Sequence, residues 1–210
     1  MVYFTAISFL CCMLFAGVAK ASEDPCVFFH QIERRAAFDI GSGKIKMQIS
    51  DVDLTAGKIT NVLFTDSVKL PMREDLDKNL DGRLSIEMQN KLVDALSELM
   101  KKALPFHPKE YHAVATESLR LAKNGKSLTE RIKKETGLSM SIITQDEEGI
   151  LGFVSAINAT ALDPDKVVSW DFGGGSFQIT AKFGDHYLVY QGKLGRKKIF
   201  KIYPMNFFKN

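Results

Sequence analysis

Two short stretches combine an aspartate with small residues in a pattern that could hold phosphate. The first is Asp39-Ile40-Gly41-Ser42-Gly43, and the second is Asp171-Phe172-Gly173-Gly174-Gly175-Ser176. Glycine has no Cβ, so its backbone can turn sharply and its N–H group can approach an anion closely. Each aspartate supplies a carboxylate suited to holding Mg²⁺ beside phosphate oxygens. A plain glycine-rich hairpin is the alternative for either stretch alone, but two phosphate loops facing each other would clamp a chain of phosphates.

Short extended segments are predicted on both sides of each glycine stretch. Before the first stretch a strand begins at residue 36, and after it Ile45, Met47 and Ile49 alternate with polar residues, as in a half-buried strand. The run 167–171 has the apolar character of a buried strand that delivers Asp171 at its end. The sequence therefore predicts two β-turn-β units. Further strands are expected over residues 59–70, 111–116, 139–144, 178–182 and 186–191.

Helical patterns alternate with strands in the middle of the chain. Helices are expected over 85–104, with Ser85 as its N-cap, over 127–135 and over 146–158. The acidic stretch 73–83 lacks the ligand spacing of a calcium loop, which favours a solvated loop. This order predicts an α/β fold in which helices pack on a mixed five-stranded sheet, followed by the opening hairpin of a second lobe.

Composition excludes several classes of protein. The chain has 210 residues, 45% of them hydrophobic, and a net charge of +3, which is too small to indicate nucleic-acid binding. An apolar run followed by Ala19-Lys20-Ala21 is typical of an export signal cleaved after residue 21. A retained membrane anchor is the alternative, although the apolar segment is short for a full span. Cleavage would leave Cys26 as the sole cysteine, so that neither a disulfide within the chain nor a cysteine metal cluster could form.

Taken together, these motifs resemble the Ppx/GppA family of exopolyphosphatases and guanosine pentaphosphate phosphohydrolases, which have the actin-like ATPase (RNase H-like) fold. The resemblance extends from about residue 36 to residue 195. It rests on an ordered set of motifs: Asp-Ile-Gly-Ser at 39–42, Ala-Thr-x-x-Leu-Arg at 115–120, Ala-Lys-Asn-Gly at 122–125, Thr-Gly-Leu at 136–138, the acids at 146–148 and the glycine run at 173–175.

The resemblance implies a role for each matching residue. Glu148 corresponds to the catalytic glutamate that acts as general base on the attacking water, whereas the sequence alone leaves it equally as an acid of a first helical turn. Arg120 corresponds to a phosphate-contacting arginine, the alternative being a surface ion pair. The remaining positions match the two phosphate loops and their metal-binding aspartates: Gly41, Ser42, Gly173, Gly174, Gly175 and Ser176 for phosphate, and Asp39 and Asp171 for Mg²⁺.

This chain departs from the family pattern after its first glycine loop, at Gly43, and after its acid pair, at Gly149, as well as in two further features. Gln178 stands where the family has a glutamate associated with metal and water, and the family's second lobe continues for many residues after position 210. The first hypothesis is therefore an exported phosphohydrolase acting on polyphosphate or a nucleotide polyphosphate with Mg²⁺. The second is a truncated, impaired member that acts at most as a phosphate-binding module. A sugar kinase or Hsp70-like ATPase fits the motifs less well.

The predicted organisation has four parts. They are a signal peptide at 1–21, a lead-in segment at 22–34, a first actin-like lobe at 35–165 and the incomplete start of a second lobe at 166–210. The mature protein is expected in the periplasm or secreted, without a stable membrane span. A homodimer or a partner that completes the second lobe is also expected.

Overall fold

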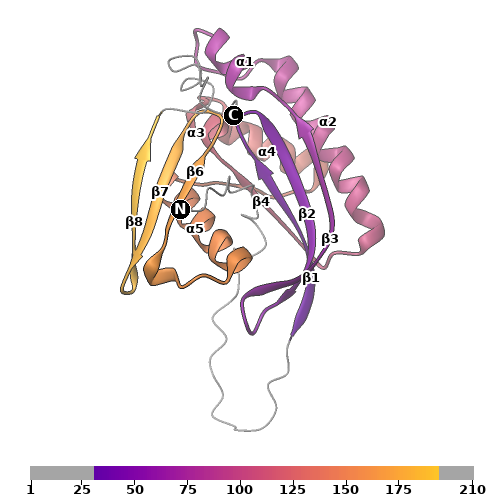
Figure 1. Ribbon diagram of the computed structural model, residues 1–210. Coiled ribbons are helices and arrows are strands. Elements are labelled where there is room, and N and C mark those ends of the chain that lie inside the picture. The colour runs from indigo at the N-terminus through magenta and orange to yellow at the C-terminus, as the bar shows by residue number, and fades with distance from the viewer. Residues whose placement is uncertain (1–30, 194–210) are drawn as a thin grey trace, which may run out of the picture.

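The computed structural model describes residues 31–193, which form two sheets with helices around them (Figure 1). The predicted signal peptide and most of the lead-in lie outside this range, as do residues 194–210. The elements in chain order are β1 Ile32–Ile40, β2 Lys44–Asp53, β3 Lys58–Lys69, α1 Met72–Lys78, α2 Ile86–Ala103, β4 Glu110–Ala115, α3 Glu117–Leu121, α4 Gly125–Thr136, β5 Ser141–Ile142, α5 Gln145–Thr160, β6 Val168–Phe172, β7 Phe177–Phe183 and β8 His186–Gly192.

The first sheet has five strands in the order β3-β2-β1-β4-β5. Strand β2 is antiparallel to β1 and β3, whereas β4 runs parallel to β1 and β5 parallel to β4. This mixed sheet with packed helices confirms the predicted α/β lobe with five strands. The second sheet is an antiparallel meander in the order β6-β7-β8.

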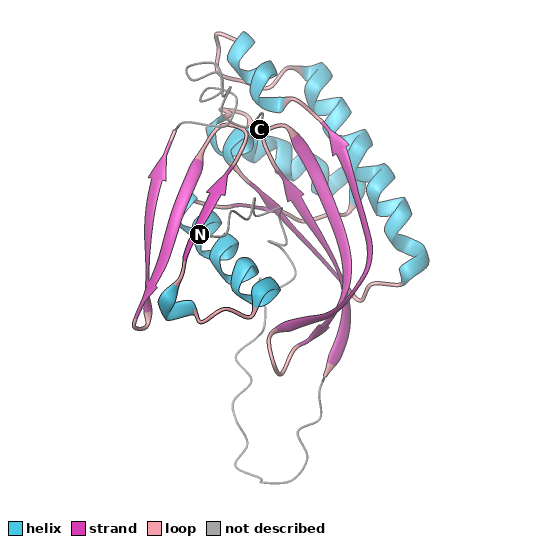
Figure 2. Ribbon diagram, in the orientation of Figure 1, coloured by secondary structure: helices cyan, strands magenta, loops and turns pink. Residues whose placement is uncertain are grey.

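Helix α5 lies between the two sheets (Figure 2). Its Leu151 packs against an apolar cluster on the first sheet that includes Ala37 and Val114, and its Phe153 ring meets the Tyr187 ring of β8 with centroids 5.6 Å apart. The opposite face of the first sheet is covered by α2 and α4 and contains the main hydrophobic core. Because side chains alternate along a strand, residues 37 and 39 of β1 face α5, and residues 36, 38 and 40 face the main core.

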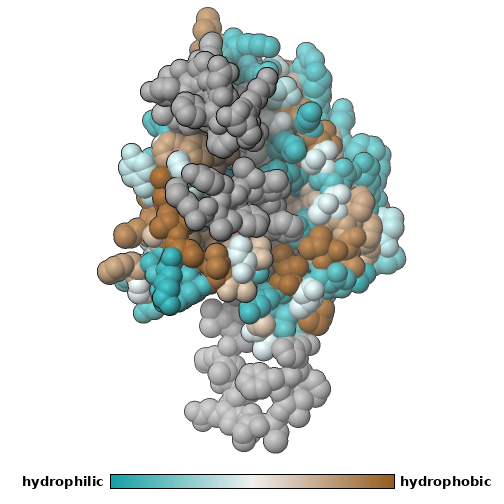
Figure 3. Space-filling view, in the orientation of Figure 1, coloured by the Kyte–Doolittle hydropathy of each residue, from teal (hydrophilic) through white to brown (hydrophobic). Residues whose placement is uncertain are grey.

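The other face of the second sheet is apolar and exposed. In-register residues Trp170, Ile179 and Tyr190 lie on this face, and hydrophobic side chains are visible at the left of Figure 3, where β7 and β8 lie. Among residues 31–193 the only helix with extensive contacts to this sheet is α5, on the opposite face. None of the helices in the same range is both long and apolar enough to cross a bilayer.

Four local predictions are corrected by the structure. The run 167–171 is not a buried strand, because Val168 and Trp170 of β6 lie on the exposed face of the second sheet. The stretch 73–83 is not a solvated loop throughout, because α1 occupies Met72–Lys78 and buries Met72 and Leu76, one helical turn apart. Strand β1 begins at Ile32 rather than residue 36, since Arg34 forms an ion pair with Asp51 of β2 that continues the pairing. The strand expected over 139–144 is reduced to two residues, which pair with the end of β4.

Helix α2 matches its predicted limits and offers a stability test. Ser85 caps it by accepting a hydrogen bond from the Met88 N–H, and Leu96 is 0% exposed in the main core, whereas Leu80 outside the helix is fully exposed. We expect Leu96→Ala to lower the free energy of unfolding by about 2–5 kcal/mol, because it leaves a cavity. Leu80→Ala should stay within about 0.5 kcal/mol of the wild type. Urea unfolding measures both, and equal midpoints would contradict the assigned core.

Candidate phosphate-binding and hydrolytic site

The two glycine stretches form equivalent four-residue loops. In the first, the Gly41 N–H donates to the Lys44 carbonyl over 3.0 Å, and in the second the Gly173 N–H donates to the Ser176 carbonyl over 2.9 Å. The strands that flank each loop pair directly before and after it, Ile40 with Ile45 and Phe172 with Phe177. None of the loop glycines has a positive φ, so where glycine is required, as at Gly173 and Gly175, the reason is close approach and not backbone conformation.

The loops lie against each other. A Cβ placed on Gly174 would contact the Ser42 Cβ at 3.4 Å, and a Cβ on Gly175 would collide with the Glu117 carboxylate. Glu117 in turn accepts a hydrogen bond of 3.0 Å from the Ser42 hydroxyl. The structure therefore brings both predicted loops to one place, as two facing phosphate loops require.

The two aspartates occupy matching positions just before the loops. Asp39 pairs across its hairpin with Lys46, and Asp171 pairs across the other hairpin with Gln178. The Lys46 Nζ lies 3.5 Å from Asp39 Oδ2, and the Asp171 carboxylate lies next to Gly152 of α5. Burial, together with the negative charge of Asp39, raises the pKa of Asp171 to about 6, while Lys46 opposes the rise. The two carboxylates are thus close enough to interact.

Glu148 is buried in the first turn of α5. The helix begins with a capping box, in which Thr144 and Glu147 satisfy each other's backbone groups, so the capping role belongs to Glu147 and leaves Glu148 turned inward. Glu148 is 8% exposed. Burial raises its pKa to about 7, since desolvation outweighs the attraction of Arg120, and the charges of Asp171 and Asp39 also raise it.

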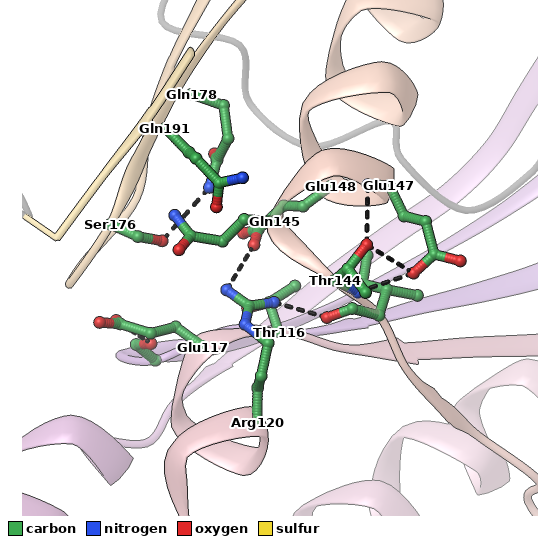
Figure 4. Close-up of polar contacts among 12 residues, drawn as sticks. Thr116, Glu117, Arg120, Thr144, Gln145, Glu147, Glu148, Ser176, Gln178 and Gln191 are labelled. Atoms are coloured by element: carbon green, nitrogen blue, oxygen red, sulfur yellow. Dashed lines mark hydrogen bonds and ion pairs between the residues drawn. The ribbon is translucent and has the colours of Figure 1, made fainter. Parts of the chain in front are cut away.

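Arg120 contacts this glutamate. Its Nη2 lies 3.0 Å from Glu148 Oε2, and its Nη1 donates to the Ile143 carbonyl over 2.6 Å (Figure 4). Arg120 comes from α3, just after β4, so the end of the parallel strand brings the guanidinium to the first turn of α5. The alternative of a surface ion pair is not what the structure has, because both partners are largely buried.

Ser176 is the last residue of the second loop, and Gln178 of β7 forms a hydrogen bond with it. Gln178 is 1% exposed and donates from Nε2 to the Ser176 Oγ over 3.4 Å, close to Glu148 in Figure 4. A Cβ on Gly149 of α5 would lie 2.7 Å from Val189 Cγ1 and 2.8 Å from Thr180 Oγ1. Glycine at position 149 therefore lets α5 approach the second sheet closely, which holds Glu148 next to the second loop.

Three residues near the loops were not identified from the sequence. Lys46 could have been found from the hairpin, because a four-residue loop places it opposite Asp39. Glu117 lies inside the Ala-Thr-x-x-Leu-Arg motif, at a variable position of that motif. Arg73 carries no such signal, because it lies in a charged stretch without a motif. Its Nη1 lies 2.6 Å from Glu117 Oε1.

A metal site of two carboxylates fits these residues. Within residues 31–193 there is no group of three or more His, Cys, Asp or Glu side chains arranged to hold a metal ion. Mg²⁺ is commonly held by one or two carboxylates, with phosphate oxygens and water as the other ligands. Asp39 and Asp171 fit that donor set, because a cation held by both would offset the desolvation and the mutual repulsion that raise the pKa of Asp171.

Comparisons with known proteins agree with this geometry. The model of the Ppx/GppA phosphatase family matches residues 51–189. Exopolyphosphatase 1 of Mycobacterium tuberculosis is 24% identical over 148 residues, and that of Mycobacterium leprae is 26% identical over 147 residues. Both matches cover 70% of this chain and 42% of the relative, so the chain spans less than half the length of these curated relatives.

Solved structures give the same result. The crystal structure of the Aquifex aeolicus member of the Ppx/GppA family has a TM-score of 0.70 and 26% identity, covering 86% of this chain and 56% of the other. An exopolyphosphatase from Cytophaga hutchinsonii shares the fold, with a TM-score of 0.69 and 19% identity over 81% of this chain and 54% of its own. Since the family model also matches more than half of the residues, the chain belongs to the Ppx/GppA phosphatase family.

Proposed function

We propose that this protein releases the terminal phosphate of polyphosphate, or of a guanosine polyphosphate, by Mg²⁺-assisted attack of water. The observation that carries the proposal is a buried glutamate, Glu148, whose pKa is raised to about 7 and which lies beside two facing glycine loops. A carboxylate with a pKa near neutrality is well suited to general base catalysis at neutral pH.

Each residue then has a role in binding or proton transfer. The backbone N–H groups of the two loops, with Ser42 and Ser176, would bind the phosphate chain between them. Arg120 would donate to the phosphoryl group that is attacked, because a planar guanidinium matches phosphate geometry. Glu148 would accept a proton from the attacking water, and its neighbour Arg120 would stabilise the ionised form before the reaction.

Asp39 and Asp171 would hold Mg²⁺ next to the loops. When bound, the ion supplies positive charge that offsets the charge on the phosphate oxygens. The two aspartates lie at equivalent positions of the two hairpins, so each loop brings one carboxylate to the cation.

The test is the release of inorganic phosphate by the purified chain. Polyphosphate and guanosine pentaphosphate should be compared as substrates, each with Mg²⁺ and with a chelator. The proposal is supported if phosphate is released only with Mg²⁺ and the substrate is left as a product with fewer phosphates. Background rates with both substrates, at all Mg²⁺ concentrations, would reject hydrolysis.

The rate should depend on pH through Glu148. A general base acts in its ionised form, so kcat/KM for polyphosphate should rise with pH and level off above about pH 7, where the pKa of Glu148 lies. An unperturbed glutamate would give a midpoint near its ordinary value of about 4.3 instead. Initial rates between about pH 5 and pH 9 measure this midpoint; a flat profile over that range would contradict the raised pKa.

A second candidate, a phosphate-binding module without turnover, is favoured by Gln178. This amide is buried and bonded to Ser176, at the position where the family has a carboxylate, so it cannot ionise to hold a cation or water. Mg²⁺-dependent binding of polyphosphate without phosphate release would favour the module. If the protein is a binding module, Gln178→Glu should create phosphate release where there was none. If it is a phosphohydrolase, the same substitution should change a rate that already exists.

We further propose that the protein is exported. The apolar stretch and Ala19-Lys20-Ala21 support cleavage after residue 21, and export favours inorganic polyphosphate over a cytoplasmic guanosine nucleotide. N-terminal sequencing of the protein recovered from the cell envelope or medium tests this. A start at Met1 in the cytoplasmic fraction would argue against export.

A further inference from the structure

Glu117 is a buried acid between the two glycine loops. It is the first residue of α3 and is 5% exposed. Figure 4 shows its side chain pointing away from the pair formed by Arg120 and Glu148. Glu117 therefore takes no part in the pair of Arg120 and Glu148, although Arg120 lies in the same short helix.

The Glu117 carboxylate contacts both loops. Oε2 accepts the hydrogen bond of 3.0 Å from the Ser42 hydroxyl of the first loop. A Cβ placed on Gly175 of the second loop would collide with the same carboxylate, so a side chain there fits only if Glu117 moves. A single carboxylate thus sets how near the two loops come to each other.

Arg73 of α1 holds this carboxylate in place. Its Nη1 lies 2.6 Å from Glu117 Oε1, and its backbone N–H donates to the Ser42 carbonyl over 2.9 Å. Its Nε also pairs with Asp77 over 2.8 Å, which fixes the guanidinium on α1. Arg73 therefore contacts the first loop in two ways: its backbone N–H binds the Ser42 carbonyl, and its side chain binds Glu117, which accepts from the Ser42 hydroxyl.

The charge of this pair suits an anion clamp. An unpaired carboxylate between two phosphate loops would repel the phosphates, and a buried charge without a partner is strongly unfavourable. Arg73 neutralises Glu117 and leaves it able to accept from Ser42. We propose that Glu117 and Arg73 are a positioning pair, which fixes the separation of the two phosphate loops and so sets the affinity for the phosphate chain.

This inference rests on the proposed function of the loops, and a binding measurement separates the two. Calorimetric titration of the purified chain with tripolyphosphate and Mg²⁺ reports affinity without any need for turnover. We expect Arg73→Ala to weaken binding by about tenfold or more. Arg73→Lys should restore part of the loss, because lysine keeps the positive charge but lacks the planar guanidinium and its several N–H donors. Arg131→Ala is the matched control, since Arg131 pairs with Glu135 on the exposed face of α4. It should leave the affinity unchanged.

A double-mutant cycle tests the contact with the second loop. Gly175→Ala should weaken tripolyphosphate binding by about tenfold, because its methyl group meets a carboxylate that Arg73 and Ser42 hold fixed. In the Glu117→Ala background the same substitution has space, so it should add less than about twofold. Urea unfolding of each variant shows whether the fold is kept.

Each outcome decides the inference. Non-additive losses of affinity in folded variants support the positioning pair, even if the wild-type chain binds tripolyphosphate and releases no phosphate. Independent losses for Gly175→Ala and Glu117→Ala overturn it, as do variants that lower only the urea midpoint. Failure of the wild-type chain to bind tripolyphosphate would overturn the phosphate clamp and the positioning pair together.

Discussion

Glu148→Gln is expected to lower the rate of polyphosphate hydrolysis by about 10²- to 10⁴-fold, the usual contribution of a general base. Glutamine has nearly the same shape, and it can still accept a hydrogen bond from Arg120, so binding should change much less than turnover. Because the buried charge is removed, the variant should fold at least as well as the wild type. Phosphate release under saturating substrate, together with tripolyphosphate affinity, measures the two effects separately.

Glu147→Gln is the matched control for this experiment. Glu147 is adjacent in sequence but exposed, and its carboxylate accepts from the Thr144 N–H over 2.7 Å in the capping box. Its substitution should cost at most about 1 kcal/mol of stability and leave the rate within a few-fold of the wild type. Equal rates for wild type and Glu148→Gln would remove Glu148 from the chemistry.

Asp171→Asn is expected to raise the Mg²⁺ concentration for half-maximal activity by about tenfold or more, because one of two carboxylates at the cation is lost. The same substitution should shift the pH midpoint of kcat/KM downward, since the charge of Asp171 contributes to the raised pKa of Glu148. A magnesium titration of this variant therefore tests whether Asp171 binds the cation, and a pH profile tests whether its charge raises the pKa of Glu148.

Asp185→Asn gives the comparison, because Asp185 is exposed in the β7–β8 turn, away from the loops. It should change neither the Mg²⁺ requirement nor the pH midpoint. If Asp171→Asn shifted the pH midpoint upward, or left the Mg²⁺ requirement unchanged, the proposed position of the cation would be wrong.

Much of the fold could be predicted because its signals are local. The alternation from Ile45 to Ile49 reports a strand with one face in the core, and the leucines of α2 recur at helical spacing; the structure confirms both. Gly137 ends α4 with φ of 78°, a conformation that favours glycine, as its place in the sequence indicated. Helix α1 was missed because seven residues, most of them charged, carry only two apolar positions.

The residues of the site could likewise be predicted only where their signals are local. The sequence by itself determined the residue types that matter: two aspartates before glycine loops, an arginine after a strand, and a glutamate at the start of a helix. Patterns of type and spacing along the chain are enough for this, and the family match over residues 51–189 agrees with them. The limits of the two lobes, at residues 165 and 166, stay a prediction.

Only the tertiary structure decided how those groups act on one another. It placed the Arg120 guanidinium on Glu148, and it placed Glu117, paired with Arg73, between the two loops. Desolvation and charge interactions depend on distances between segments far apart in sequence, such as Ser42, Glu117 and Gly175. No local pattern contains those distances, so the raised pKa of Glu148 and the contact between the loops follow from packing alone.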